Sequence, residues 1–173
     1  MSPNPNKDLG PCSVLWDRSG ANIQVNPTFG GVSFRDEVLH VEIKEDQQGE
    51  TPVDHVHTGR IVEVTVPMTR SSLAKLEAAI AGSTASATNL KVSNKVGQSC
   101  FINARELVIK PVEDGVAAAE STWLYVHRCY PFSNLDWIYD NAGQRVTNVV
   151  FKAYPDDQSG QVNEMWQMGP YTP

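Results

Sequence analysis

Histidines and a carboxylate gather in one polar segment, where they could hold a metal ion. His55 and His57 flank Val56, Asp54 precedes them, and His40 lies upstream. On a strand, alternate residues share a face, so the imidazoles of His55 and His57 could reach one ion. No third ligand follows at a recognisable spacing, and two solvated loop histidines explain the pattern more simply. We therefore expect no metal site and no cofactor.

Motifs for nucleophilic catalysis and phosphate binding are missing from the sequence. There is no Gly-x-Ser-x-Gly elbow, no cysteine with a local activation signature and no glycine-rich phosphate loop. Gly30 and Gly31 lie in a predicted turn, where they supply backbone freedom. No pair of carboxylates stands out as acid and base. We expect that the protein is not an enzyme and has no catalytic residues.

Three cysteines lie far apart in the sequence, at Cys12, Cys100 and Cys129. None of them forms a Cys-x-x-Cys pair suited to zinc or dithiol redox chemistry. The simpler interpretation is three reduced, mostly buried thiols. The other is that some of them form disulfides between subunits once the protein has left the cell, which the odd count permits.

Four tryptophans, at Trp16, Trp123, Trp137 and Trp166, raise the question of a sugar-binding surface. Flat aromatic faces stack on sugars, which would suit a monomeric carbohydrate-binding β-sandwich. The four residues are dispersed, however, and packing in the core or at subunit contacts explains them without a ligand. The size of the particle in solution separates the two interpretations.

The polar segment lies between two runs that alternate as half-buried strands do. Leu39, Val41 and Ile43 alternate with polar neighbours before it, and valines alternate over 62–66 after it. The two runs predict a hairpin whose connection spans about 45–59. Connections longer than about 12–15 residues are uncommon and are usually functional or ordered against a partner.

The rest of the pattern predicts one mainly β domain over 9–173, after a flexible arm at 1–8. An apolar stripe of period 3.6 indicates one helix at about 71–81. The segment 113–120 does not distinguish a loop from a helical turn. The fold class is two packed antiparallel sheets, as a sandwich or barrel, with one flanking helix. Further strands are expected at 9–16, 31–44, 100–110, 123–130 and 145–154.

The charge balance excludes one class of function. Fourteen basic and twenty acidic residues give a formal net charge of −6, which disfavours tight binding to nucleic acid through phosphate neutralisation. No apolar run approaches the roughly 18 residues that cross a bilayer, and the first residues lack the apolar centre of a secretory signal. We expect a protein made in the cytoplasm that does not contact a membrane.

The segment from Lys44 to Asp54, Lys-Glu-Asp-Gln-Gln-Gly-Glu-Thr-Pro-Val-Asp, resembles a loop of bacteriophage tail tube proteins. The stretches 9–17 and 27–32 look like that family's opening strand and the turn into its second strand. The stretch 145–156 is similar to its closing strand. Each motif is short, but together they cover nearly the whole chain in the family's order.

The resemblance implies a structural protein of the virion, assembled in the host cytoplasm and located in the viral tail. Six copies would close a ring by pairing strand edges, and stacked rings would form the tube that conducts DNA during ejection. The tip of the hairpin would contact the next ring. The residues implied in this contact are Glu45, Asp46, Gln47, Gln48, Gly49, Glu50, Thr51, Pro52, Val53 and Asp54.

The implied partners are further copies of the chain and other tail proteins: the tape measure, the tail terminator and, in a contractile tail, the sheath. DNA would pass without specific binding. A tube protein of a secretion or contractile injection system is an alternative that the fold does not exclude.

Acidic residues that face the bore would repel the DNA passing through it, within about 8 Å in physiological salt. Glu42 and Glu63 lie on the polar faces of the two hairpin strands, and we expect them to face the bore. The other possibility for both is a solvated outer face.

Overall fold

The computed structural model describes residues 11–17, 20, 22–25, 31–68, 72–113, 115–133, 146–156 and 163–171. Outside these ranges lie the predicted arm at 1–8, Trp137, the first residue of the predicted helix and the start of the predicted first and last strands. Within them the chain is mainly β, with one helix, a large antiparallel sheet and a small second sheet in a sandwich-like arrangement. The predicted fold class is confirmed.

The large sheet has nine strands, and its hydrogen-bonded order is β2-β1-β7-β9-β10-β4-β3, with β11 added to β9 and β8 added to β7. The strands are β1 (Cys12–Trp16), β2 (Ile23–Val25), β3 (Ser33–Lys44), β4 (Pro52–Met68), β7 (Arg105–Glu113), β8 (Val116–Ala117), β9 (Leu124–Pro131), β10 (Thr147–Tyr154) and β11 (Trp166–Met168).

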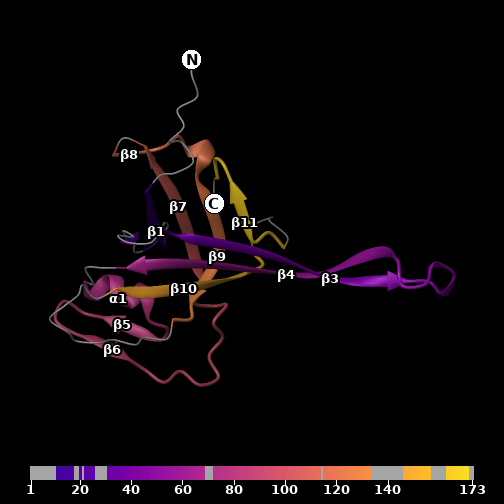
Figure 1. The fold of residues 1–173 in the computed structure, drawn as a ribbon. Coiled ribbons are helices and arrows are strands. Elements are labelled where there is room, and N and C mark those ends of the chain that lie inside the picture. Colours follow the sequence, from indigo (N-terminus) through magenta and orange to yellow (C-terminus); the bar gives the residue numbers. More distant parts are fainter. Residues whose placement is uncertain are drawn as a thin grey trace, which may run out of the picture.

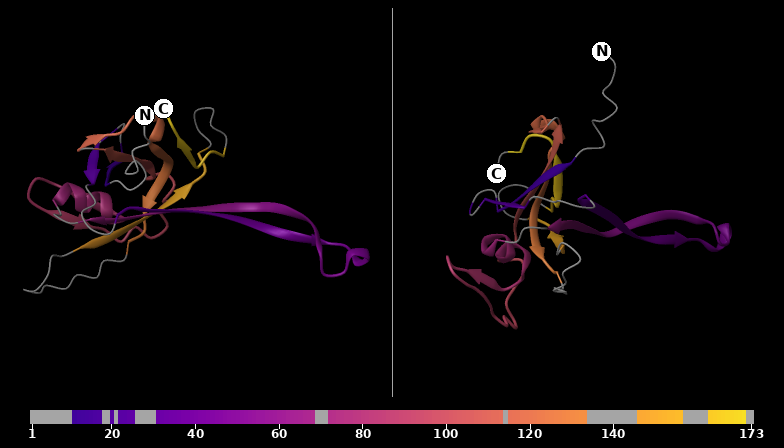
Figure 2. Two further views of the ribbon diagram at one scale, coloured as in Figure 1. Left: turned by 45° about the horizontal axis from the view of Figure 1, so that its top comes forward. Right: turned by 60° about the vertical axis from the view of Figure 1, so that its left-hand side comes forward.

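The sheet twists so strongly that its two halves cross. In Figure 1, the antiparallel strands β1, β7, β9 and β11 stand roughly upright, whereas β10, β4 and β3 lie across the molecule beneath them. The second view in Figure 2 shows the same crossing from the side. This twist gives the single hydrogen-bonded path the two layers of a sandwich.

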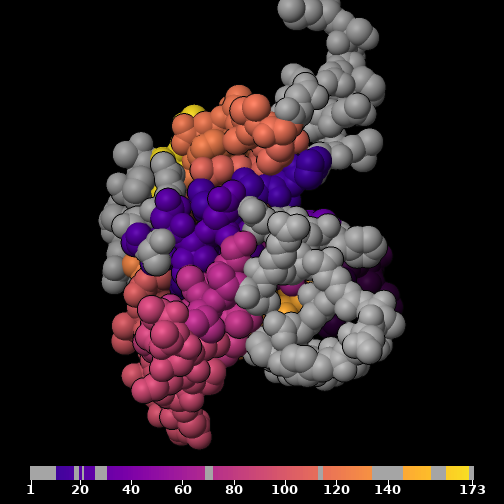
Figure 3. Space-filling view, turned by 90° about the vertical axis from the view of Figure 1, so that its left-hand side faces the viewer, coloured from indigo at the N-terminus to yellow at the C-terminus, as the bar shows by residue number. Residues whose placement is uncertain are grey.

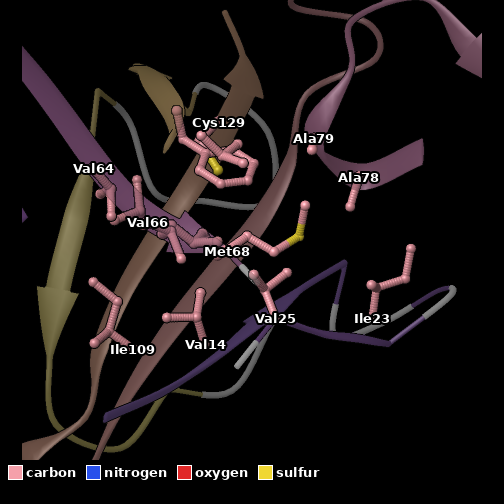
Figure 4. Packing of buried hydrophobic residues seen from close by; sticks show 14 of the residues in the cluster. Val14, Ile23, Val25, Val64, Val66, Met68, Ala78, Ala79, Ile109 and Cys129 are labelled. Atoms are coloured by element: carbon pink, nitrogen blue, oxygen red, sulfur yellow. The ribbon is translucent and has the colours of Figure 1, made fainter. Parts of the chain in front are cut away.

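The core fills the space between the two halves. Buried aliphatic residues of β1, β4, β7 and β10 meet there, and the fully buried Met68 lies among them, as Figure 4 shows. The period-two alternation of β4 supplies Val64 and Val66 to this cluster, and Val62 on the same strand is also buried. Each buried aliphatic side chain contributes about 1.5–3 kcal/mol to folding. The outer half of the hairpin adds no residue to this cluster.

The helix α1 (Leu73–Ala79) is shorter than predicted by two residues at each end. Ser72 caps its start, because its hydroxyl accepts a hydrogen bond from the amide of Lys75 at 3.3 Å. Leu76 is buried against the core, as the apolar stripe predicts. No helix in the described ranges is long and apolar enough to cross a membrane.

A small two-stranded sheet, β5 (Ser83–Ala85) with β6 (Leu90–Val92), follows α1 where the sequence indicates an exposed connection. With α1 it forms the lobe below the first strands in Figure 3. The predicted strand at 100–110 begins only at Arg105, because Cys100 to Asn103 form turns. The segment at 113–120, which the pattern left open, contains β8 and the start of the short 3-10 helix η2 (Glu120–Thr122).

Candidate assembly surface

The hairpin of β3 and β4 extends far beyond the body of the molecule (Figures 1 and 2). The two strands pair from Ser33 opposite Thr65 to Lys44 opposite Pro52. Among the described residues, β10 pairs with β4 only from Glu63 to Met68. The outer part is therefore a free two-stranded ribbon, which is marginally stable by itself in water. We call residues 38–61 the ribbon.

The connection at the tip is shorter than predicted. Strand β4 begins at Pro52, so the expected loop of about 45–59 is wrong beyond residue 51, and Pro52, Val53 and Asp54 belong to the strand. The turn contains the 3-10 helix η1 (Asp46–Gln48) and Gly49, whose φ of 66° is readily adopted by glycine. The polar residues after the turn resemble a loop in sequence because both faces of the ribbon are exposed.

One face of the ribbon is apolar and uncovered. Val41 lies directly opposite Val56, and alternation along β3 places Leu39 and Ile43 on the same face. Ile61 joins this face because the extra residue Thr58 shifts the alternation of β4, and Asp54, opposite Ile43, lies on it as well. Val41 is 56% exposed and Val56 is 46% exposed. We call Leu39, Val41, Ile43, Val56 and Ile61 the apolar face. An uncovered row of β-branched and aliphatic side chains is typical of a surface that a partner covers.

The outer edge of β3 is also uncovered. β3 ends the strand order of the large sheet, and no strand in the described part of the chain pairs with its outer edge. β3 has 12 residues, and such a long edge offers a row of backbone donors and acceptors to another strand. Both the face and the edge of the ribbon are thus open to a second chain.

The base of the ribbon is fixed to the body through Asp36. Its carboxylate oxygen Oδ2 accepts a hydrogen bond from Arg60 Nη1 at 2.9 Å and one from the indole Nε1 of Trp166 at 3.1 Å. The ring of Trp166 also packs edge-on against Phe34, with 5.4 Å between the ring centroids. These contacts set the direction in which the ribbon leaves the body.

The face opposite the apolar face carries His40, Glu42, His55 and His57. Glu42 lies opposite His55, and His40 lies opposite His57. The sequence pattern pointed to His55 with His57, but the structure brings His55 together with His40 and Glu42 instead. Strand pairing supplies the third ligand that sequence spacing did not reveal. His55 lies within the predicted connection and the register contains a bulge, so the sequence pattern holds no signal for this group.

The two candidates for the bore lie in different surroundings. Glu42 is exposed, and its carboxylate lies 3.9 Å from Lys44 Nζ. Glu63 is half-buried and forms an ion pair with Lys152 at 3.2 Å. Alternation along β3 places Glu42 on the opposite face of the hairpin from Arg35, which pairs with Glu63. The role of both residues in a bore stays a prediction.

The three cysteines are free thiols. Cys129 is completely buried, and this burial raises the pKa of its thiol well above the usual range. Its sulfur donates a hydrogen bond to the carbonyl of Arg105. Such a thiol cannot reach another subunit while the chain is folded, so Cys129 drops out of the expected set of disulfides. Cys12 and Cys100 are partly exposed and keep that option.

The described tryptophans do not form a flat exposed surface. Trp16, Trp123 and Trp166 are each partly buried. The indole of Trp123 donates a hydrogen bond to the carbonyl of Ala118 at 2.8 Å, and Lys110 Nζ lies 3.8 Å from the centre of its ring. Their rings pack within the body, as the simpler interpretation of the sequence expects.

A hollow of about 240 Å³ lies between α1 and the body and is lined by residues including Trp16, Glu77 and Arg105. Single apolar side chains elsewhere are more exposed, such as Val96 at 86% and Ile102 at 72%, but the ribbon carries several exposed apolar side chains on one face. Comparison of the chain with protein-family models and with curated proteins found no match.

Proposed function

We propose that the protein is a structural subunit of a phage tail tube, in which identical copies close into rings of six and the rings stack into a conduit for DNA. One observation carries the proposal: a long ribbon leaves the body with its apolar face and its outer strand edge uncovered. The resemblance of the sequence to tail tube proteins supplies the number of copies and the order of assembly.

The apolar face supports self-association because it is costly to leave in water. Burial of apolar surface contributes about 25 cal/mol per Å², and the five side chains of the apolar face present this surface together. A strand of a second copy that pairs with β3 would satisfy its backbone groups at the same time. Assembly would thus remove both features that expose a single copy to aggregation.

The charge of the chain suits a conduit. A formal charge of −6 disfavours tight binding of DNA through phosphate neutralisation, and acidic groups near the bore would repel the passing duplex. On this proposal DNA passes through the tube without specific binding, the protein acts without a cofactor, and it is located in the virion tail.

The tube of a secretion or contractile injection system is the second candidate, since the same ribbon would serve it. A monomeric carbohydrate-binding module is less well supported, because the described tryptophans pack within the body.

A pair of charge substitutions on the ribbon tests the proposal. Val41→Asp places a negative charge on the apolar face. His57→Asp places the same charge on the opposite face, in the neighbouring residue pair of the two strands. We expect V41D to abolish tubes in negative-stain electron micrographs and H57D to retain them. Tubes of wild-type length from V41D would overturn the proposed role of the apolar face.

A further inference from the structure

Three exposed side chains on the polar face of the ribbon converge. They are His40 and Glu42 on β3 and His55 on β4. We propose that these three residues bind one divalent transition-metal ion of the zinc class. This inference does not depend on the proposed function, because it concerns a single chain.

The backbone places the three residues on one face. Glu42 and His55 are direct partners in the antiparallel ladder, and His40 is two residues before Glu42 on the same strand. Residues two apart on a strand share a face, and direct partners across an antiparallel pair share one as well. The convergence therefore follows from the register and not only from the positions of the side chains.

The distances suit a site that closes on an ion. One potential ligand atom from each residue lies within 4.8 Å of the other two. The His55 Nε2 atom lies 4.0 Å from Glu42 Oε1, and the rings of His40 and His55 are 5.2 Å apart between centroids. Zinc bonds of about 2.0–2.2 Å need these atoms slightly closer, and exposed side chains can rotate to provide this.

The types of ligand select the metal. Two imidazoles and one carboxylate form the three-ligand set of zinc sites that keep a fourth position open. Calcium and magnesium prefer oxygen ligands throughout, so two histidines disfavour them. His57 lies opposite His40 but outside the group of three. Lys44 competes for Glu42 at 3.9 Å, although its closer partner is Glu50 at 3.0 Å.

The position of the site gives the ion a structural effect. The ladder is interrupted between Leu39 and His40, where Thr58 is the extra residue on β4. An ion held by His40 and His55 would join the two strands directly beyond this bulge. It would therefore stiffen the part of the ribbon that β10 does not support.

Zinc titration of the full chain tests the site. Chelator-treated protein in a phosphine reductant is titrated with Zn²⁺ by isothermal titration calorimetry at neutral pH. We expect one saturable ion per chain, and losses of affinity of about tenfold or more in H40A, E42Q and H55A, which is about 1.4 kcal/mol. Hydrogen exchange of the amides of residues 38–44 and 54–60 should slow with Zn²⁺ in the wild type and not in H55A.

Three matched variants separate this site from other zinc ligands. We expect Glu37→Gln, on the opposite face of the same strand, and Cys100→Ser to keep the wild-type affinity. His57→Ala should lose less affinity than H55A. Wild-type protein that binds no zinc, wild-type affinity in both H40A and H55A, or a larger loss in H57A than in H55A would overturn the proposal.

Discussion

The carboxylate of Asp36 accepts a hydrogen bond of 3.1 Å from the indole of Trp166, which lies 130 residues later in the chain. Asp36 lies at the base of the ribbon, and Trp166 begins the short strand β11 on the body. Arg60, on the other strand of the hairpin, donates to the same carboxylate oxygen at 2.9 Å. One side chain thus joins both strands of the hairpin to the body.

Replacement of Asp36 by alanine should destabilise the fold. The change leaves the part-buried indole of Trp166 without its acceptor, which costs about 1–3 kcal/mol. The guanidinium of Arg60 is 37% exposed, so it can bind water instead. Urea denaturation measures the effect. The exposed Glu37→Gln variant is the control and should lie within about 0.5 kcal/mol of the wild type. Equal stability of D36A and E37Q would show that Asp36 does not anchor the ribbon.

Shortening of the tip should separate ring formation from stacking. Residues 45–51 connect Lys44 to Pro52, which face each other in the ladder, so an Asn-Gly turn can replace all seven. Because the hairpin and its apolar face stay intact, we expect folded protein that forms rings without long tubes in electron micrographs. Long tubes from this variant would contradict a role of the tip in contact between rings.

The stability of the fold should fall as the pH falls below about 6.5. The side chain of His127 is fully buried, and this burial lowers the pKa of its imidazole, opposed by the nearby carboxylates of Glu164 and Asp156. The unfolded chain then binds a proton more readily than the folded chain. The contribution of neutral His127 to the free energy of unfolding is therefore complete above the pKa of histidine in the unfolded chain, and it declines as the pH falls below that value. The ring of Tyr171 also packs against this imidazole.

The His127→Gln variant checks this contribution. The amide does not titrate, so the difference in unfolding free energy between the variant and the wild type should shrink as the pH falls from about 7 to about 5. Carboxylates of the chain contribute equally to both proteins and cancel in the comparison. A difference that stays constant across this range would exclude His127 as the cause.

Reversal of the charge at Glu42 tests its expected place in the bore. Glu42 is exposed, so Glu42→Lys should leave the subunit folded and the tubes intact, while the added positive charge holds DNA and slows ejection. Gln98→Lys adds a positive charge at an exposed position away from the ribbon and serves as control. Infectivity of the E42K phage equal to that of the control would argue against a place in the bore.

The sequence predicted the body of the fold better than its ribbon. Buried strands such as the one with Val62, Val64 and Val66 alternate because only one face meets the core, and α1 repeats its apolar residues for the same reason. The first part of β4 has no core face. Its histidines and Asp54 therefore resembled a polar loop, and the apolar partners Val41 and Val56 were not recognised as one surface.

The remaining features depend on contacts between distant parts of the chain. The three-residue strand β2 and the equally short β11 are too short for any period, and they exist because β1 and β9 offer them an edge. The group of His40, Glu42 and His55 depends on a register that includes a bulge. Sequence spacing along one strand reveals neither these short strands nor this group of three residues.

Electron microscopy of the purified wild-type protein, with its mass in solution measured in parallel, tests the central claim most directly. If further copies of the chain cover the apolar face and the outer edge of β3, the protein forms rings of six or tubes with a hollow axis. A uniform population of single chains that stays monomeric at high concentration would contradict this account.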